Sequence, residues 1–271
     1  MALTSRFLAS GSGWRVDDVI CNFGPNDRPF EERHHGVCVA AVTEGTFQYR
    51  STLGSAVLAP GSLLLGNEHH CFECGHEHGV GDRCLSFQFA PDFLEAVAAE
   101  IPGARAIAFT VPRLPPHPAL LPLIATAQAA RDDGDDADFE EVALRLAGAV
   151  CVALAAGKKR ARPPSARDER RIAAALRLIQ AQPDAPLPLA ALAGAAAMSP
   201  YHFLRTFRAV VGMTPHQYVL HTRLLRAAVQ LRRTREEISA IAFAAGFNDL
   251  STFNRRFARI IGRSPSAYRA G

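Results

Sequence analysis

One short stretch, residues 69–84, carries the side chains best suited to chemistry. It reads HHCFECGHEHGVGDRC, and its donors follow the spacing C-x2-C-x-H-x-H-x5-C. These donors are Cys71, Cys74, His76, His78 and Cys84. Thiolate and imidazole are the ligands that Zn²⁺ prefers, and four of them arranged as a tetrahedron close a site. The stretch predicts a zinc site with four of these five ligands, structural if closed and able to report metal availability if open.

Two other interpretations of this stretch stay open. Cys71, Cys74 and Cys84 are also suited to a thiol switch, because a nearby imidazolium lowers a thiol pKa. Alternatively the stretch is a hairpin loop rich in polar residues, whose cysteines are buried and inert.

The remaining histidines, cysteines and acidic residues give weaker indications of a metal site. His34 and His35 begin a strand, and a histidine pair there is more typical of a surface or pocket lining than of a metal site. Cys21, Cys38 and Cys151 have apolar neighbours in the sequence and are expected in the core. The acidic residues 132–138 lack the twelve-residue loop and closing Glu of a Ca²⁺ site, so a solvated loop is expected.

A second set of chemistry-bearing residues lies in a duplicated basic region near the C-terminal end. At an offset of 50 residues, one copy repeats the other: Phe203, Arg205, Phe207 and Gly212 correspond to Phe253, Arg255, Phe257 and Gly262. Phenylalanines spaced i,i+4 lie on one helical face and are expected in the core. Ser199 before Pro200, and Asn248-Asp249, have the chemistry of helix N-caps. Each copy therefore predicts a helix–turn–helix unit, near residues 189–212 and 238–262.

The face opposite the phenylalanines is polar or basic and is predicted to read DNA. Its residues are Tyr201, His202, Arg205 and Arg208 in the first unit, and Ser251, Thr252, Asn254 and Arg255 in the second. Ordinary amphipathic helices with solvated arginines would explain each helix but not the duplication. A joining helix near 215–231 would be about 25 Å long. It would hold the two units toward successive major grooves, about 34 Å apart.

The charge of the chain is divided between its halves. From Ala166 onward there are 16 arginines and 6 acidic residues, whereas the first 165 residues have 14 basic and 20 acidic ones. This asymmetry indicates a polyanionic partner for the second half only. The start lacks the pattern of a secretory signal, and the apolar residues 146–157 are too few to span a bilayer. A cytoplasmic protein without a membrane partner is expected, with reduced cysteines.

The elements that would position these residues divide into a β-rich and a helical part. Residues 1–30 read as an arm with one strand at most. Short β-like runs at 37–51, 56–66 and 83–89, with turns at Glu44-Gly45 and Pro60-Gly61, predict a small barrel or sandwich. A helix after Pro91 and two longer helical segments follow, and the second of these has a broad apolar face. We expect domains at 1–156 and 172–271, separated by a charged, proline-containing linker at 157–171.

The C-terminal part resembles the DNA-binding domain of the AraC/XylS family of bacterial transcription regulators. The residues that carry the likeness read FLRTFRAVVG, RLLRAA, ISAIAFAAGF and GRSPSAYR. Leu204 departs from the family, in which a polar base-contacting residue is common at this position. The resemblance implies an α+β chain, with a cupin-like β-barrel followed by helices for dimerisation and then the all-α DNA-binding domain.

The function expected from these features is sequence-specific regulation of transcription. A homodimer would bind the major groove of double-stranded operator DNA and would contact RNA polymerase if it activates transcription. The N-terminal domain would sense a small molecule, a metal ion or a redox state, with zinc as the expected cofactor if a metal is bound. The chain is not expected to be an enzyme; the alternative is a metal-dependent cupin enzyme fused to a DNA-binding domain.

Overall fold

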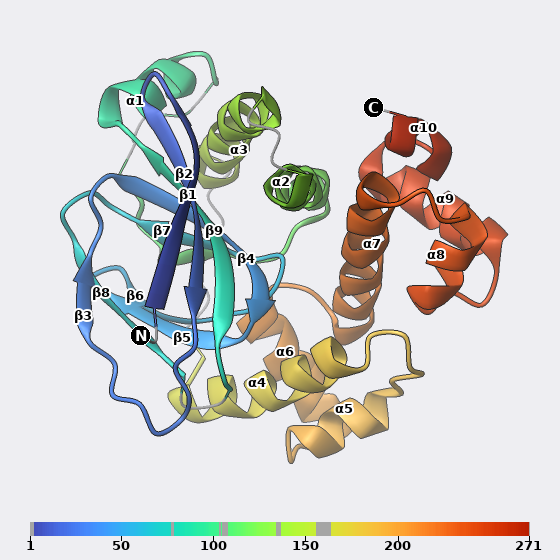
Figure 1. Ribbon diagram of the computed structural model, residues 1–271. Coiled ribbons are helices and arrows are strands. Elements are labelled where there is room, and N and C mark those ends of the chain that lie inside the picture. Colours follow the sequence, from blue (N-terminus) through green and yellow to red (C-terminus); the bar gives the residue numbers. More distant parts are fainter. Residues whose placement is uncertain are drawn as a thin grey trace.

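The computed structural model describes residues 3–76, 79–102, 104, 108–133, 137–155 and 164–270. Its N-terminal half contains two antiparallel sheets (Figure 1). The larger has the order β1-β2-β9-β4-β7-β10, and the smaller has the order β3-β8-β5-β6. The strands are β1 (Leu3–Gly11), β2 (Trp14–Cys21), β3 (Glu31–Arg33), β4 (Val37–Gly45), β5 (Phe47–Ser51), β6 (Gly54–Leu58), β7 (Leu63–Gly66), β8 (Cys71–Gly75), β9 (Asp82–Phe89) and β10 (Arg113–Leu114). The mixed α and β character is confirmed, but the closed barrel is wrong, because the strands form two separate sheets.

Strand β4 shows why two layers form. Cys38 and Val42 face the smaller sheet in one apolar cluster. Val39 and Ala41, on the opposite face, pack in the cluster that contains helices α2 and α3. A strand buried on both faces needs an unbroken apolar run, which explains VCVAAV. The chain turns after β4 and after β6, as predicted, but each turn carries it from one sheet into the other.

The first thirty residues contain a long hairpin, so the expectation of an arm with one strand is wrong. Strand β2 pairs with β1 on one side and with β9 on the other. Its Asp17 and Asp18 are buried, because Arg15 and Arg83 donate hydrogen bonds of 2.7 to 2.9 Å to their carboxylates. Burial of a charge requires such a partner. The two aspartates interrupt the apolar pattern and conceal the strand in the sequence.

Ten α-helices and one 3-10 turn are described. They are α1 (Pro91–Ala99), η1 (Pro118–Leu120), α2 (Leu121–Asp133), α3 (Ala137–Ala155), α4 (Ala166–Ala181), α5 (Leu189–Ala195), α6 (Pro200–Val211), α7 (Pro215–Arg233), α8 (Ile238–Ala244), α9 (Leu250–Ile261) and α10 (Pro265–Ala270). Helix α4 begins inside the predicted linker 157–171, of which residues 157–163 lie outside the described part. No helix in the described part is long and apolar enough to cross a membrane.

The helical C-terminal half packs directly on the β-rich half. Helix α2 lies between the larger sheet and α7, and α4 runs below the sheets (Figure 1). One apolar cluster joins the sheet and α2 to α7, α9 and α10. A second joins α4, α5 and α6 to Val57 and Ala59. At the edges of this contact, Arg233 lies 3.2 Å from Asp132 and the Tyr218 hydroxyl donates to the carbonyl of Pro60.

Candidate functional site

The first helix–turn–helix unit consists of α5 and α6, as predicted. Phe203 and Phe207 on α6 are fully buried and contact each other with ring centroids 5.4 Å apart. Ser199 occupies the N-cap position, but its side chain makes no capping hydrogen bond. Gly212 ends the helix with φ of 90°, a left-handed conformation in which glycine is favoured. These features fix one face of α6 in the core and leave the other free.

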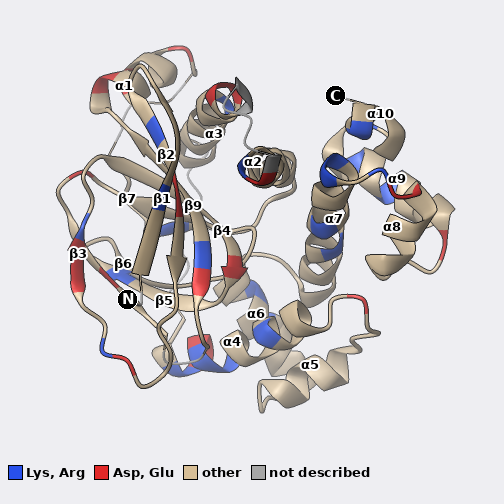
Figure 2. Cartoon of the chain, viewed as in Figure 1, with Lys and Arg blue, Asp and Glu red and all other residues tan. Residues whose placement is uncertain are grey.

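The free face of α6 contains the predicted DNA-contact residues. Tyr201 is 80% exposed, and Arg205 and Arg208 are exposed beside it, whereas His202 is half-buried. Leu204 is also exposed, between the basic positions. Figure 2 shows Lys and Arg in blue on helices of the C-terminal half, α7 and α10 among them. The first unit therefore presents aromatic and basic groups around an apolar side chain.

The second unit, α8 and α9, repeats this arrangement with a firmer N-terminal cap. The Asp249 carboxylate accepts a hydrogen bond of 2.7 Å from the backbone N–H of Thr252. Hydrogen bonds from the side chain and then the backbone N–H of Thr252 lower the pKa of Asp249. Ser251, Asn254 and Arg255 are exposed on α9, while Thr252 is half-buried and accepts a 3.4 Å hydrogen bond from Arg255. All four predicted residues of this unit lie on the polar side of α9.

Helix α7 connects the two units, and its Arg223 touches both. The guanidinium donates to the carbonyls of Pro183 (2.7 Å) and Ala185 (2.9 Å) before α5, and to that of Gly246 (2.6 Å) in the turn before α9. Gly246 has φ of 85°, and a Cβ added there would lie 3.0 Å from the guanidinium carbon of Arg223. Arg223 therefore links the segment before α5 to the turn before α9.

A cleft of about 790 Å³ lies between the units. Its lining includes Leu204 from α6, Arg223 from α7, and Thr252 and Arg256 from α9. The two predicted reading helices thus border one concave surface, and each contributes residues from its exposed or half-buried side.

The predicted metal ligands are distributed differently from the sequence motif. Phe72 and Cys74 on β8 pack between the sheets, so alternation along the strand directs Cys71 to the other face. Cys84 is buried on β9, and His76 follows β8. His78 lies outside the described residues. Because the prediction needs only four of the five ligands, a set without Cys71 stays a prediction.

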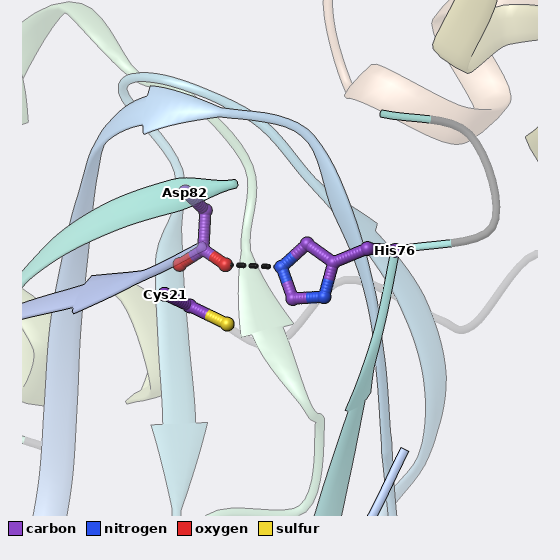
Figure 3. Close-up of side chains that lie close together, drawn as sticks. All are labelled: Cys21, His76 and Asp82. Atoms are coloured by element: carbon purple, nitrogen blue, oxygen red, sulfur yellow. Dashed lines mark hydrogen bonds and ion pairs between the residues drawn. The ribbon is translucent and has the colours of Figure 1, made fainter. Parts of the chain in front are cut away.

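His76 instead joins two residues outside the predicted set, Cys21 and Asp82. The ligand atoms of the three lie within 4.8 Å of one another (Figure 3). Asp82 Oδ2 is 2.5 Å from His76 Nε2, and only 1% of the His76 side chain and 7% of the Asp82 side chain are exposed. Burial lowers the pKa of His76, but hydrogen bonds with Asp82 and Cys21 outweigh this and raise it to about 9. Among the described residues, this is the group of three that could hold a metal ion.

Sequence reasoning missed two members of this group for one reason. Cys21 ends β2 and Asp82 begins β9, and the two are directly paired in the register of the larger sheet. Because β2 was concealed in the sequence, nothing indicated that Cys21 would lie beside residue 82. The expectation of buried cysteines is confirmed for Cys21, Cys38 and Cys151. His34 is buried as well, and its Nε2 lies 3.0 Å from the Tyr49 hydroxyl.

Comparison with known proteins identifies the C-terminal part. A family model described as a helix-turn-helix domain matches residues 192–271. The MmsAB operon regulatory protein of Pseudomonas aeruginosa is 35% identical over 85 residues, which are 31% of this chain and 28% of that protein. The match thus spans less than a third of that relative's length.

Two further similarities concern the same part. Regulatory protein SoxS of Salmonella typhimurium is 40% identical over 86 residues, covering 32% of this chain and 80% of SoxS. A crystal structure of the DNA-binding domain of AdpA in complex with a target DNA is 29% identical, covers 37% of this chain and 90% of that chain, and has a TM-score of 0.36. The extent of the match to SoxS, with the two helix–turn–helix units described above, shows that the chain belongs to the AraC/XylS family of bacterial transcriptional regulators.

Proposed function

We propose that the chain is a sequence-specific DNA-binding regulator of transcription that binds double-stranded operator DNA through the major groove. The observation that carries this proposal is the pair of exposed faces on α6 and α9, which border one cleft and are held by Arg223. Arginine provides bidentate hydrogen bonds to guanine, and asparagine provides them to adenine. Arg205, Asn254 and Arg255 are therefore the residues to which we assign base contacts.

The β-rich half is proposed to control this activity. It contacts α4, the helix that precedes the first unit: the Gln180 amide donates to Thr46 Oγ1 (2.8 Å), and the Gln48 amide donates to Glu169 Oε2 (2.9 Å). An effector can change DNA binding only if it binds with different affinity to two arrangements of the β-rich half and the helical half. The contacts of α4 with β5 are the natural place for two such arrangements to differ.

We also propose a homodimer, because α3 keeps apolar side chains exposed on one of its sides. Leu144 and Val152 are each 53% exposed, although most of the helix packs against α1 and α2. A second copy of the same helix would cover them. We propose contact with RNA polymerase only for the case in which the protein activates transcription. Because its proposed partner is DNA, we also propose that the protein lies in the bacterial cytoplasm. The reported relatives are regulators, which supports a non-enzymatic role and gives the fused-enzyme alternative no support.

The test is selection of bound sequences from a random DNA pool with the purified full chain. One enriched motif is expected. Arg205→Ala and Arg255→Ala should each weaken binding to that motif by about 1–3 kcal/mol at matched salt, if they make bidentate base contacts. Arg28→Ala is the matched control, because Arg28 is exposed in the loop between β2 and β3, away from the proposed DNA-binding and dimer faces. If both test variants bind like the control, the assignment of α6 and α9 to base reading is wrong.

A further inference from the structure

A buried group of three metal-capable side chains lies between the two sheets. Cys21 and Asp82 come from neighbouring strands of the larger sheet, and His76 reaches them from the end of β8 in the smaller one (Figure 3). The ligand atoms lie within 4.8 Å of one another. In a tetrahedral zinc site such atoms are about 3.5 Å apart, given metal–ligand lengths near 2.0–2.3 Å. Shifts of about an ångström would seat the ion.

The chemistry of the three groups suits one divalent ion. A thiolate from Cys21 and the carboxylate of Asp82 carry two negative charges, which match the charge of Zn²⁺, and neutral His76 adds the third bond. An ion bound in this way leaves no net charge in the interior, where an unpaired charge is costly. Thiolate together with imidazole favours zinc over Mg²⁺ or Ca²⁺, which prefer oxygen.

The surroundings of the group support its use as a ligand set. The Cys84 thiol lies 3.6 Å from Asp82 Oδ1 and donates to it, which leaves Oδ2 directed at His76. Metal-bound carboxylates are held by outer hydrogen bonds of this kind. His76 Nε2, which faces Asp82, is the ring nitrogen directed at the proposed ion. Cys74 also packs between the sheets, on the same face of β8 as Phe72, but it is not one of the three residues whose ligand atoms lie within 4.8 Å of one another.

The chain just before Asp82 leads from this group to the DNA-binding half. A Cβ added to Gly79 would lie 3.3 Å from the Thr46 carbonyl and 3.6 Å from Cδ of Arg177 on α4. Thr46 itself accepts the hydrogen bond from Gln180 on the same helix. The Gly81 N–H donates to the carbonyl of Phe23 (2.8 Å), which ties this segment to the chain following Cys21. An ion that joins Cys21 to residues 76 and 82 would therefore fix the surface on which α4 rests.

We propose that Cys21, His76 and Asp82 bind a zinc ion, and that this ion regulates DNA binding by fixing the contact of residues 79–82 and Thr46 with α4. The regulatory part rests on the proposed function, whereas the metal site does not. The sequence motif alone predicts a different set of ligands, which includes Cys71 among its candidates and does not include Cys21.

That difference provides the experiment. The full chain is purified under reducing conditions, freed of metal and titrated with zinc against a chromophoric chelator. One zinc per chain is expected. Cys21→Ser and Asp82→Asn should lower the zinc affinity at least tenfold, whereas Cys71→Ser, the matched control, should leave it unchanged. Equal affinity in wild type and Cys21→Ser, or loss only in Cys71→Ser, would overturn the site.

Cobalt substitution guards against variants that lose metal by misfolding. Sulfur-to-cobalt charge-transfer absorption reports a bound thiolate directly and is expected in wild type and Cys71→Ser. In Cys21→Ser, whose fold is checked by circular dichroism, this absorption should weaken or disappear. An unchanged cobalt spectrum in a folded Cys21→Ser protein would contradict the ligand assignment.

The regulatory part is tested with the DNA motif selected by the full chain. Zinc should change the affinity of wild type for this motif at least fivefold and should not change that of Cys21→Ser. Equal affinity of wild type with and without zinc would overturn the regulation. Enrichment of no motif, with zinc binding at Cys21 intact, would contradict the proposed function and leave the metal site standing.

Discussion

The side-chain amide of Gln48 on β5 donates a hydrogen bond of 2.9 Å to Glu169 Oε2 on α4, and both residues are buried. The two residues belong to different halves of the chain. Burial raises the pKa of Glu169, while the hydrogen bond from Gln48 and the charge of Arg113 act in the opposite direction. The first turn of α4 is therefore fixed to the smaller sheet by a polar contact without solvent around it.

Removal of one partner should weaken this contact more than removal of both. Gln48→Met leaves the Glu169 carboxylate buried without its hydrogen bond, which costs about 1–3 kcal/mol of unfolding free energy. Adding Glu169→Met should recover only part of that loss, because it removes the buried carboxylate but also takes a negative charge away from Arg113. Urea unfolding of the two single variants and the double variant measures the coupling energy. Additive effects of the two substitutions would show that the residues act independently.

Arg223 should matter to DNA binding although it is not proposed to touch a base. Arg223→Met removes three hydrogen bonds that connect the two helix–turn–helix units through Pro183, Ala185 and Gly246. Since the two reading helices must fit successive grooves, a changed separation should lower affinity for the selected motif about tenfold or more.

A matched variant separates this effect from a loss of charge. Arg226→Met removes a positive charge from the exposed side of the same helix. Arg226→Met should lower the affinity for DNA only if Arg226 neutralises a phosphate. In that case the affinity of the variant should depend less on salt concentration than that of wild type. An Arg223→Met protein that binds the motif like Arg226→Met would contradict the positioning role.

The helical half was predictable from the sequence because its signals are local. Helix caps, the phenylalanine pairs and the glycines after α6 and α9 each act within a few residues, and the helices form where these signals lie. The correspondence between the two copies indicated a pair of helix–turn–helix units, which no single helix could indicate. The linker boundary at Ala166 was missed because RDERR reads as charged linker, although Ser165 accepts a hydrogen bond from the Asp168 N–H and caps α4.

The β-rich half and its metal-capable group depend on contacts between distant residues. Cys21 lies opposite Asp82 only because β2 pairs with β9, and strand pairing is not encoded by spacing along the chain. Strand β8 also splits the cysteine–histidine motif between two faces, since successive side chains alternate. The stretch 69–84 therefore contains two residues of the proposed site, His76 and Asp82, of which only His76 was among the predicted ligands, and Cys21 lies outside the stretch.

The two units differ in a cap that substitution can measure. The Asp249 carboxylate accepts from the Thr252 N–H, whereas the Ser199 side chain caps nothing. Asp249→Ala should therefore lower the thermal midpoint, while Ser199→Ala should leave it nearly unchanged. The pKa of Asp249 is lowered in the folded protein, so its stabilising effect should disappear as the pH falls through that value. An equal effect of the two alanines in thermal scans at neutral pH would contradict this difference.

His221 on α7 should make the protein less stable in mild acid. Its ring is buried beside Gly61, and neither ring nitrogen has a hydrogen-bond partner in the described structure. Burial, together with the nearby His117, lowers the pKa of His221 from 6.5 to about 4. Between these values the unfolded chain binds a proton that the folded chain does not. The free energy of unfolding should therefore fall as the pH decreases from 6.5 to 4, by up to about 3 kcal/mol from this group.

The variant His221→Leu isolates this contribution, because it removes the proton-binding group and keeps an apolar side chain against Gly61. Urea unfolding at several pH values between 4 and 7 should give a shallower decline for His221→Leu than for wild type. His216→Leu, a substitution at an exposed site on the same helix, controls for the loss of a histidine and should follow the wild-type profile. If His221→Leu and wild type lose stability in parallel, the acid sensitivity comes from other groups. His34, whose pKa burial also lowers to about 4, would then be the next residue to replace.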